Sequence, residues 1–319
     1  MSRMSVLDPS ITYVPKYPVF VEVTKKHEEL HWHEGDAKLQ QDVEQWKTGV
    51  ITDTEKYFIS SILRLFTHSD FLVAMDYYDN LIPVVRNNEA RNMLGSFAAR
   101  EGIHQRAYAL LNDTLGFGEK FYEEFLQYKE MAAKADFMVD VKNDTVENLA
   151  IGIATQVLVE GVCLFASFAM LLNFSRYGKL LGMTDINLWS IRDESIHVDG
   201  LAKLFSVICT ENPEIVTQSF KKRIYSAARE VVRLEDAFIE TAFRLGGLEG
   251  ITAQEVKQYI RAVTDYRMQQ LGLKAQFHEK NPFEWLDWLT SSNTVENFFE
   301  TNTVSYSKNS MSGEYSTGY

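Results

Sequence analysis

LAIGIATQVLVEGVCLFASFAMLLNF, residues 149–174, is the stretch of this 319-residue chain that decides the fold. It is apolar over almost its whole length and is interrupted chiefly by Gln156 and by Glu160 near its middle. The stretch is long enough to cross a membrane, but a carboxylate at mid-span is costly in lipid, and the flanks lack a clear asymmetry of Lys and Arg. We therefore expect the central helix of a bundle, covered on all sides. Glu160 then needs a partner, because a buried carboxylate must be neutralised, paired or bound to a cation.

Most of the remaining chain has helical periodicity too. From about residue 36 onward apolar residues recur at helical spacing, prolines are scarce, and no sustained β-branched alternation calls for a sheet. The predicted class is all-α, and long helices with short connections are typical of a bundle. We expect an extended N-terminal segment over 1–35, one helical domain over 36–301, and a flexible polar tail over 302–319. The predicted helices cover residues 53–81, 88–115, 145–174, 185–209, 213–245 and 252–271.

Composition narrows the class of protein. A chain that is 45% hydrophobic and 13% aromatic can build a substantial core and is neither disordered nor collagen-like. Its two cysteines, Cys163 and Cys209, are too few for a disulfide framework and lack the paired spacing of a zinc or iron–sulfur site, so we expect the reducing cytoplasm. The net charge of -12 leaves no broad basic face for nucleic acid. The first residues show no targeting segment.

Two Glu-x-x-His motifs, Glu101 with His104 and Glu194 with His197, each place a carboxylate and an imidazole on one face of a predicted helix. Ferritin-like dimetal bundles combine two such motifs with one carboxylate from each of two other helices. Glu160 is one solitary carboxylate of this kind, and LFTHSDFLVAM supplies the other. Oxygen-rich ligation with one imidazole per metal suits iron or manganese better than zinc. The sequence thus predicts a four-helix core around a dinuclear site with the ligands Asp70, Glu101, His104, Glu160, Glu194 and His197.

The motif alone is weak evidence, because Glu28 and His31 form a third copy to which we assign no role. An isolated pair of this kind is more often a helix surface contact or a core histidine. The other two copies differ in their placement. Each lies within a long periodic helix, and each is preceded by an apolar helix that carries a solitary carboxylate, in the order of two helical hairpins.

Tyr108 is a candidate redox residue beside the predicted site. It follows His104 by four residues, so it shares the face of the ligands and lies within a turn of the metals. A plain core tyrosine is the simpler interpretation. A phenol held beside an oxygen-activating dimetal centre can, however, be oxidised to a radical.

These residues resemble the small, radical-generating subunit of class I ribonucleotide reductase. The resemblance runs from about Trp32 to Tyr306 and keeps the order and spacing of the family's motifs. The matching motifs are SDFL around Asp70, REGIHQRAY from Arg100, LVEG around Glu160, IRDESIH from Ile191, NPFEWL from Asn281 and NFFETNTVSY from Asn297. The family's ferritin-like bundle agrees with the predicted helices.

The resemblance implies a role for each site residue. Asp70, Glu101 and His104 would bind one metal, and the other three ligands the second, with Glu101 and Glu194 as bridging candidates. Tyr108 falls at the position of the radical tyrosine. The resemblance further implies that the carboxylate of Asp193 holds the ring of His104. Trp32, in LHWHEG, would continue the radical path from Asp193 to the surface, and Tyr306 in the tail would relay the radical into the large subunit.

The implied function is oxidation of the dimetal site to generate a radical equivalent, held on Tyr108 or on the metals, that a separate large subunit uses to reduce ribonucleotides to deoxyribonucleotides. The resemblance also implies a homodimer and docking of the tail on the large subunit, although this tail is less acidic near its end than is usual in the family. Two alternatives use the same ligands: a stand-alone dimetal oxidase or hydroxylase, and a ferritin-like iron-binding protein. The donor atoms of the six ligands fit two iron or two manganese ions per chain, with iron favoured.

Overall fold

Long helices build the part of the chain that the computed structural model describes, residues 5–9, 14–123, 128–139, 142–244 and 247–292. Within these residues the only β contact is an isolated bridge between Leu248 and Ile251, so the all-α prediction is confirmed. The α-helices are α1 (Pro18–Glu29), α2 (Gln40–Thr48), α3 (Asp53–Met75), α4 (Asn88–Thr114), α5 (Glu119–Glu123), α6 (Lys129–Val139), α7 (Val146–Leu158), α8 (Phe165–Leu172), α9 (Leu181–Glu211), α10 (Gln218–Ala242), α11 (Ala253–Gln270) and α12 (Glu284–Ser292). Shorter 3-10 and π turns are η1 (Glu34–Asp36), η2 (Asp76–Leu81), η4 (Val159–Cys163), η5 (Asn173–Tyr177) and η6 (Pro213–Ile215).

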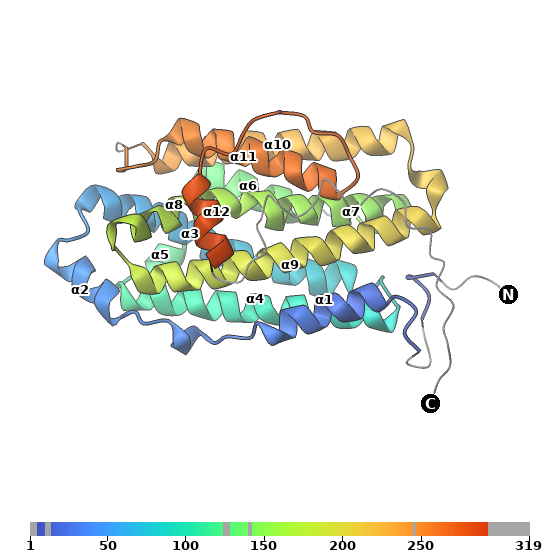
Figure 1. The fold of residues 1–319 in the computed structure, drawn as a ribbon, viewed down its shortest axis with the longest axis horizontal. Helices are drawn as coiled ribbons and strands as arrows, with labels where there is room; N and C mark the ends of the chain where they lie inside the picture. The colour runs from blue at the N-terminus through green and yellow to red at the C-terminus, as the bar shows by residue number, and fades with distance from the viewer. Residues whose placement is uncertain (1–4, 10–13, 124–127, 140–141, 245–246, 293–319) are drawn as a thin grey trace.

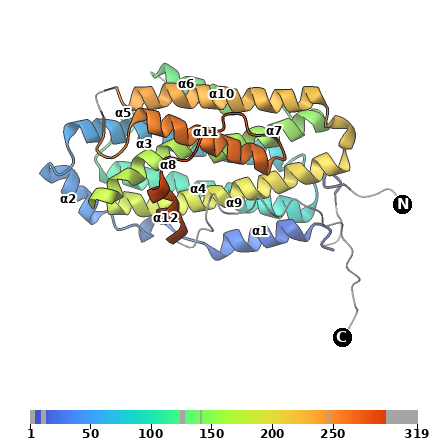
Figure 2. The same cartoon turned by 45° about the horizontal axis from the view of Figure 1, so that its top comes forward.

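The long helices lie side by side along one axis (Figure 1). Helices α3, α4, α7 with α8, and α9 form the four-helix core, in which α3 packs on α4, α7 packs on α9, and α4 packs on α9. The α10–α11 pair covers α7 and α8 from one side, and α1 lies along the opposite edge of the bundle (Figures 1 and 2). The core helices are thus enclosed, as the apolar sequence of the central helix predicts.

The central apolar stretch is one helical path with a widened turn in its middle. Helix α7 runs into the π turn η4, and α8 continues beyond it. All residues of η4 and α8 are buried. A π turn inserts an extra residue into an α-helix and often marks a functional site. Here it carries Glu160, which the periodicity alone does not distinguish from a residue of a regular helix.

The helix boundaries agree with the predicted ones within a few residues, except at the starts of α10 and α9. The helix predicted from residue 213 is there the 3-10 turn η6, and α10 itself starts at Gln218. The other difference is at α9. The prediction begins this helix at residue 185, whereas it starts at Leu181. Asp42 of α2 explains the difference, because its carboxylate accepts hydrogen bonds from the backbone N–H groups of Gly182 and Met183 at 3.1 and 2.7 Å. A cap supplied by another helix leaves no local signal in the sequence.

The N-terminal segment differs from the prediction. The expected extended conformation over 1–35 is wrong for Pro18–Glu29, which form α1 and pack on α4 and α9. Pro18 stands in the first turn, where proline is favoured, and Phe20, Val23 and His27 are buried along one face. The charged residues of KKHEE interrupt the apolar periodicity, so the sequence pattern did not reveal this short buried face. The domain limits of 36–301 and 302–319 stay predictions, and the tail lies outside the described residues.

Two helical segments are long and apolar enough to cross a membrane, Asp53–Leu81 and Val146–Tyr177. In the most apolar window of each, 69% and 100% of the residues are buried inside the protein. Both belong to the core of the bundle, as expected for the central helices of a large α-helical domain.

Candidate metal centre

The six predicted ligands come from the four core helices. Asp70 lies on α3, Glu101 and His104 lie on α4, Glu160 lies on η4, and the remaining pair, Glu194 and His197, lies on α9. Each of the six side chains is at most 1% exposed. Four of them, Glu101, Glu160, Glu194 and His197, offer ligand atoms within 4.8 Å of one another.

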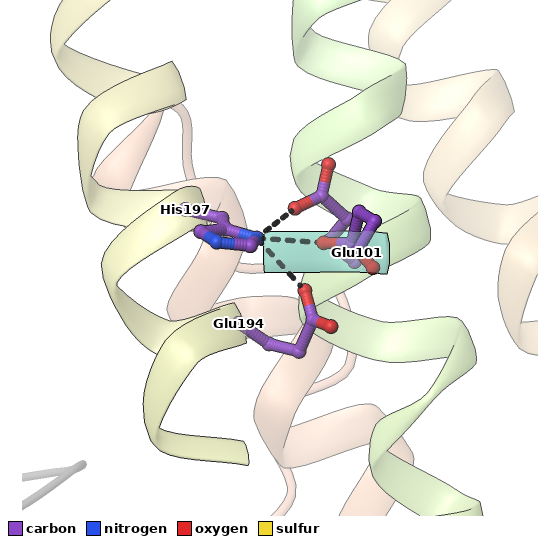
Figure 3. Close-up of side chains that lie close together, drawn as sticks. Glu101, Glu194 and His197 are labelled. Atoms are coloured by element: carbon purple, nitrogen blue, oxygen red, sulfur yellow. Dashed lines mark hydrogen bonds and ion pairs between the residues drawn. The ribbon is translucent and has the colours of Figure 1, made fainter. Parts of the chain in front are cut away.

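Glu101 and Glu194 stand between the two imidazoles. Glu101 places Oε1 3.0 Å from Nδ1 of His197 and Oε2 3.2 Å from Nδ1 of His104. Glu194 places Oε1 3.2 Å from Nδ1 of His104 and Oε2 3.3 Å from Nδ1 of His197. Figure 3 shows both carboxylates directed at the ring of His197. Each carboxylate thus divides its two oxygens between two binding positions.

Glu160 and Asp70 complete the two positions. Oε2 of Glu160 lies 3.2 Å from Nδ1 of His197, whereas Asp70 is an electrostatic neighbour of His104. The set therefore divides into one carboxylate and one imidazole on each side of the shared pair. Asp70 and His104 lie outside the group of four, and the assignment of the six ligands to two metals stays a prediction.

Asp193 joins the His104 side to Trp32. The Nε2 atom of His104 lies 3.2 Å from Oδ2 of Asp193, and the indole N–H of Trp32 donates to the same oxygen at 2.7 Å. Trp32 is 4% exposed, its ring stacks near that of His104 with centroids 5.8 Å apart, and Trp189 packs beside it at 5.0 Å. Asp193 thus lies against the ring of His104, and Trp32 lies against Asp193, whereas their roles stay predictions. Trp189 is a neighbour that the sequence did not predict.

Arg100 is a second unpredicted partner of Asp193. Its guanidinium lies 2.7 Å from Oδ2 and also donates to the backbone carbonyls of Leu30 and His27. Burial alone would raise the pKa of Asp193, but His104, Arg100 and Trp32 outweigh it and hold the pKa well below its ordinary value. Arg100 directly precedes a ligand, but no local pattern links it to a carboxylate on another helix.

His27 of α1 supports the second imidazole and was missed by sequence reasoning. Its Nε2 lies 3.1 Å from Nε2 of His197, and its Nδ1 lies 2.6 Å from the hydroxyl of Ser96. Burial, with His197 and Arg100, lowers the pKa of His27 to about 2, so the ring is neutral. A metal-bound imidazole usually donates its second N–H to an acceptor, which His27 supplies here. His27 lies one residue before the unassigned Glu28/His31 motif.

Glu160 also has two unpredicted partners. The hydroxyl of Tyr77 donates to both of its oxygens, at 2.7 and 2.9 Å, and the amide of Gln156 donates to Oε1 at 2.6 Å. Gln156 precedes Glu160 by four residues, a spacing that predicts contact on a helix. The two polar interruptions of the apolar stretch therefore meet each other.

Tyr108 is fully buried next to the Asp70 side. Its hydroxyl lies 3.1 Å from Oδ1 of Asn187 and 3.5 Å from the hydroxyl of Ser190, and its ring stacks on Phe66 with centroids 4.6 Å apart. Burial, then the charge of Asp70, raises the pKa of the phenol well above its ordinary value. The neutral phenol is thus the stable form in this environment. Tyr306, the expected tail tyrosine, lies outside the described residues.

The buried charges fit a cation-binding site. Burial raises the pKa of Asp70 well above its ordinary value and that of Glu160 to about 8. Burial alone would lower the pKa values of His104 and His197, but the surrounding carboxylates raise both well above the ordinary value. Oδ2 of Asp70 has no hydrogen-bond partner among the described residues. Four carboxylates around two imidazoles, with an unpartnered buried oxygen, form an oxygen-rich donor set that suits iron or manganese.

Comparison with known proteins points to one family. A family model described as "Ribonucleotide reductase, small chain" matches residues 10–282. A probable ribonucleoside-diphosphate reductase small subunit of Invertebrate iridescent virus 3 is 36% identical over 98% of this chain and 88% of its own length. These matches include all six candidate ligands.

Solved structures share the fold. The dimanganese(II)-NrdF of Streptococcus sanguinis superposes with a TM-score of 0.76 at 20% identity, over 85% of this chain and 95% of its own. The ribonucleotide reductase Rnr4 homodimer of Saccharomyces cerevisiae superposes with a TM-score of 0.72 at 21% identity, over 90% of each chain.

Proposed function

The chain belongs to the ribonucleotide reductase small-chain family, and on this premise we propose that it holds two metal ions, generates a radical at Tyr108 and passes it to a separate large subunit. The large subunit would use the radical to reduce ribonucleotides to deoxyribonucleotides. The observation that carries the proposal is the placement of Glu101 and Glu194, each of which faces both imidazoles with separate oxygens.

In the proposed site, Asp70 and His104 would hold one ion, Glu160 and His197 would hold the other, and Glu101 and Glu194 would serve both. The donor atoms suit iron or manganese, with iron favoured. Metals held there would supply one-electron redox chemistry, once oxidised by oxygen or a reduced-oxygen oxidant. Asp193 and His27 keep the two imidazoles in orientation through their outer nitrogens.

Oxidation of Tyr108 would pass one electron from the phenol to the oxidised metal centre and the phenolic proton to a carboxylate of the site. Its burial supports storage, because the ring is shielded from reductants in solution. The hydrogen bonds with Asn187 and Ser190 fix the hydroxyl, and the charge of Asp70 lies close enough to act on it. From Tyr108 the radical would pass to Trp32, which is hydrogen-bonded to Asp193. Tyr306 would then transfer the radical to the large subunit.

The release of protons when metal ions bind is a test of the proposed metal site. The pKa of Glu160 is raised to about 8, so this carboxyl group carries a proton at neutral pH that a metal must displace. The raised pKa values of Asp70 and of both imidazoles act in the same direction. Calorimetric titration of the metal-free protein with Mn²⁺ without oxygen should show two ions per chain. Affinity should rise from pH 6 to pH 8, about tenfold per pH unit for each proton released. Titrations in buffers of different ionisation enthalpy count these protons.

The third Glu-x-x-His motif provides the matched control. The variant Glu28→Gln/His31→Gln should bind Mn²⁺ as the wild type does, because neither residue belongs to the proposed site. One ion or none per wild-type chain, or an affinity that is the same at both pH values, would contradict the proposed dinuclear centre.

A homodimer is the proposed assembly. The yeast structure is described as a homodimer. Phe71, Met75 and Tyr78 are 50%, 41% and 54% exposed and follow one another at helical spacing on α3 and η2. An apolar stripe of this kind marks a candidate interaction surface. We expect this stripe to lie in the interface between two copies.

Met75→Arg is expected to convert the dimer to a monomer, because it places a charge in the apolar contact. Sedimentation velocity at micromolar concentration measures the change. Leu181→Arg alters another residue, 42% exposed, at the start of α9 and should leave the dimer intact. A Met75→Arg protein that sediments as the wild type would exclude this surface as the dimer interface.

The cytoplasmic location of the protein stays a prediction.

A further inference from the structure

The π turn η4 is held by two cationic side chains from neighbouring helices. The Lys134 ammonium of α6 donates to the carbonyl of Cys163 at 3.0 Å, and Nε of Arg267 of α11 donates to the carbonyl of Gly161 at 3.2 Å. A π turn disturbs the regular ladder of backbone hydrogen bonds, so its carbonyls need other donors when they are buried. Both cations therefore act on the backbone on either side of Val162, directly after Glu160.

Lys134 is buried with a dedicated counter-ion. It is 1% exposed, its ammonium lies 2.5 Å from Oε1 of Glu235 on α10, and it lies over the ring of Phe238 at 4.4 Å. Taking an ammonium and a carboxylate out of water costs several kcal/mol per ion, so a buried pair is weak evidence for a gain in stability. The position of this pair against η4 suggests a different role.

Arg267 and Gly161 fit each other. A Cβ atom added at Gly161 would lie 2.6 Å from Nε of Arg267, which is closer than side-chain carbons approach other atoms. The guanidinium is 1% exposed and lies over the ring of Phe165 at 4.9 Å. The residue after Glu160 must therefore be a glycine for Arg267 to reach the backbone.

We propose that Lys134 and Arg267 are positioning residues that hold the π turn in the conformation in which Glu160 reaches its binding position beside His197. Glu235 fixes Lys134 in place. Lys134 reaches η4 through the carbonyl of Cys163 and Arg267 through the carbonyl of Gly161, so we assign the action of both to the backbone of η4. The inference rests on the proposed function, because it assumes that Glu160 binds a metal.

The variant Lys134→Met/Glu235→Leu tests Lys134 without leaving a buried charge. Replacement of a buried pair by apolar residues is often neutral or stabilising, so the melting temperature should stay close to that of the wild type. The Cys163 carbonyl nevertheless loses its donor. We expect one of the two Mn²⁺ ions to bind about 10–100-fold more weakly while the other is unchanged, the size of effect usual for residues that support metal ligands. Calorimetry measures both affinities, and electron paramagnetic resonance should show isolated Mn²⁺ in place of the coupled pair.

Arg267 is tested by a pair of variants. Arg267→Met removes the donor to Gly161 and should weaken the same single ion. Arg267→Lys keeps a cation near the carbonyl and should recover most of the affinity. Met and Lys have similar volumes, so both variants fill the space of the Arg267 side chain about equally well. If only Arg267→Lys recovers the affinity, the cation supports the π turn through its charge and hydrogen bond and not by filling space.

Arg261 and Asp236 provide the matched control. Their ion pair, at 2.6 Å, also joins α11 to α10, but its recorded contacts do not include η4. Arg261→Met/Asp236→Leu should therefore leave both affinities unchanged.

Two results would overturn the inference. One is a Lys134→Met/Glu235→Leu protein that binds both Mn²⁺ ions with the affinities of the wild type. The other is a variant that loses both ions and also melts at a lower temperature, because the Lys134–Glu235 pair would then stabilise the whole fold and not the π turn in particular. A wild-type protein that fails to bind two ions contradicts the proposed function itself, and this result is separate from both.

Discussion

Tyr108→Phe is expected to abolish ribonucleotide reduction with the large subunit, by at least on the order of 10³-fold, while both metals stay bound. The phenol of Tyr108 is the proposed store of the oxidising equivalent, and phenylalanine cannot be oxidised in its place. The ring keeps its stacking on Phe66, and only the hydrogen bonds with Asn187 and Ser190 are lost. The stability should fall by only about 1 kcal/mol. Electron paramagnetic resonance after exposure of the metal-loaded protein to oxidant should show no organic radical.

Tyr77 serves as a comparison that tests whether the radical forms at Tyr108 or at another buried tyrosine. It is the second fully buried tyrosine at the site, and its hydroxyl donates to Glu160 on the other side of the metal positions. Tyr77→Phe should keep the radical signal, with a change in the affinity of one ion. Tyr259→Phe, at a buried tyrosine that packs on Phe283, should change neither. A radical that survives in Tyr108→Phe and disappears in Tyr77→Phe would show that the assignment to Tyr108 is wrong.

A chain that ends after residue 301 is expected to lose turnover with the large subunit and to keep its metals, fold and radical. The removed residues, 302–319, contain Tyr306 and the proposed docking tail. Phe283 and Leu286, each 2% exposed, already anchor the α12 region to the bundle, so the truncation should leave the core intact. Aromatic residues near the end of the removed segment, Tyr315 and Tyr319, are the kind that anchor a docked peptide.

Tyr306→Phe in the full-length chain separates the two roles of the tail. It should keep the affinity for the large subunit, measured by surface plasmon resonance, and lose turnover. The truncated chain should lose both. Full turnover by the truncated chain would contradict the docking and the relay together.

The sequence predicted the parts of the site that follow helical spacing. The two Glu-x-x-His motifs lie on α4 and α9 as expected, and the solitary carboxylates Asp70 and Glu160 lie on the other two core helices. These predictions succeeded because the relevant spacing is local and the helices are long and apolar.

The surrounding residues were missed because their contacts join distant parts of the chain. His27 lies on a short, charged helix that was expected to be extended, yet it contacts His197. Arg100 and Asp193 meet across two helices, and no spacing in the sequence relates them. The π turn was missed as well, because an extra residue in an apolar stretch leaves the hydrophobic pattern unchanged.

The enclosed central stretch also has a consequence for synthesis of the chain. Val146–Tyr177 is apolar enough to enter a lipid bilayer, and most of its coverage comes from α9, α10 and α11, which follow it in the sequence. A ribosome reaches the end of α11 roughly 90 residues later, which takes about 5–20 s at 5–20 residues per second. During that interval the stretch is an exposed apolar segment open to chaperones, membranes and other nascent chains. Translation speed over α9 to α11 should therefore influence how much of the newly made protein becomes soluble.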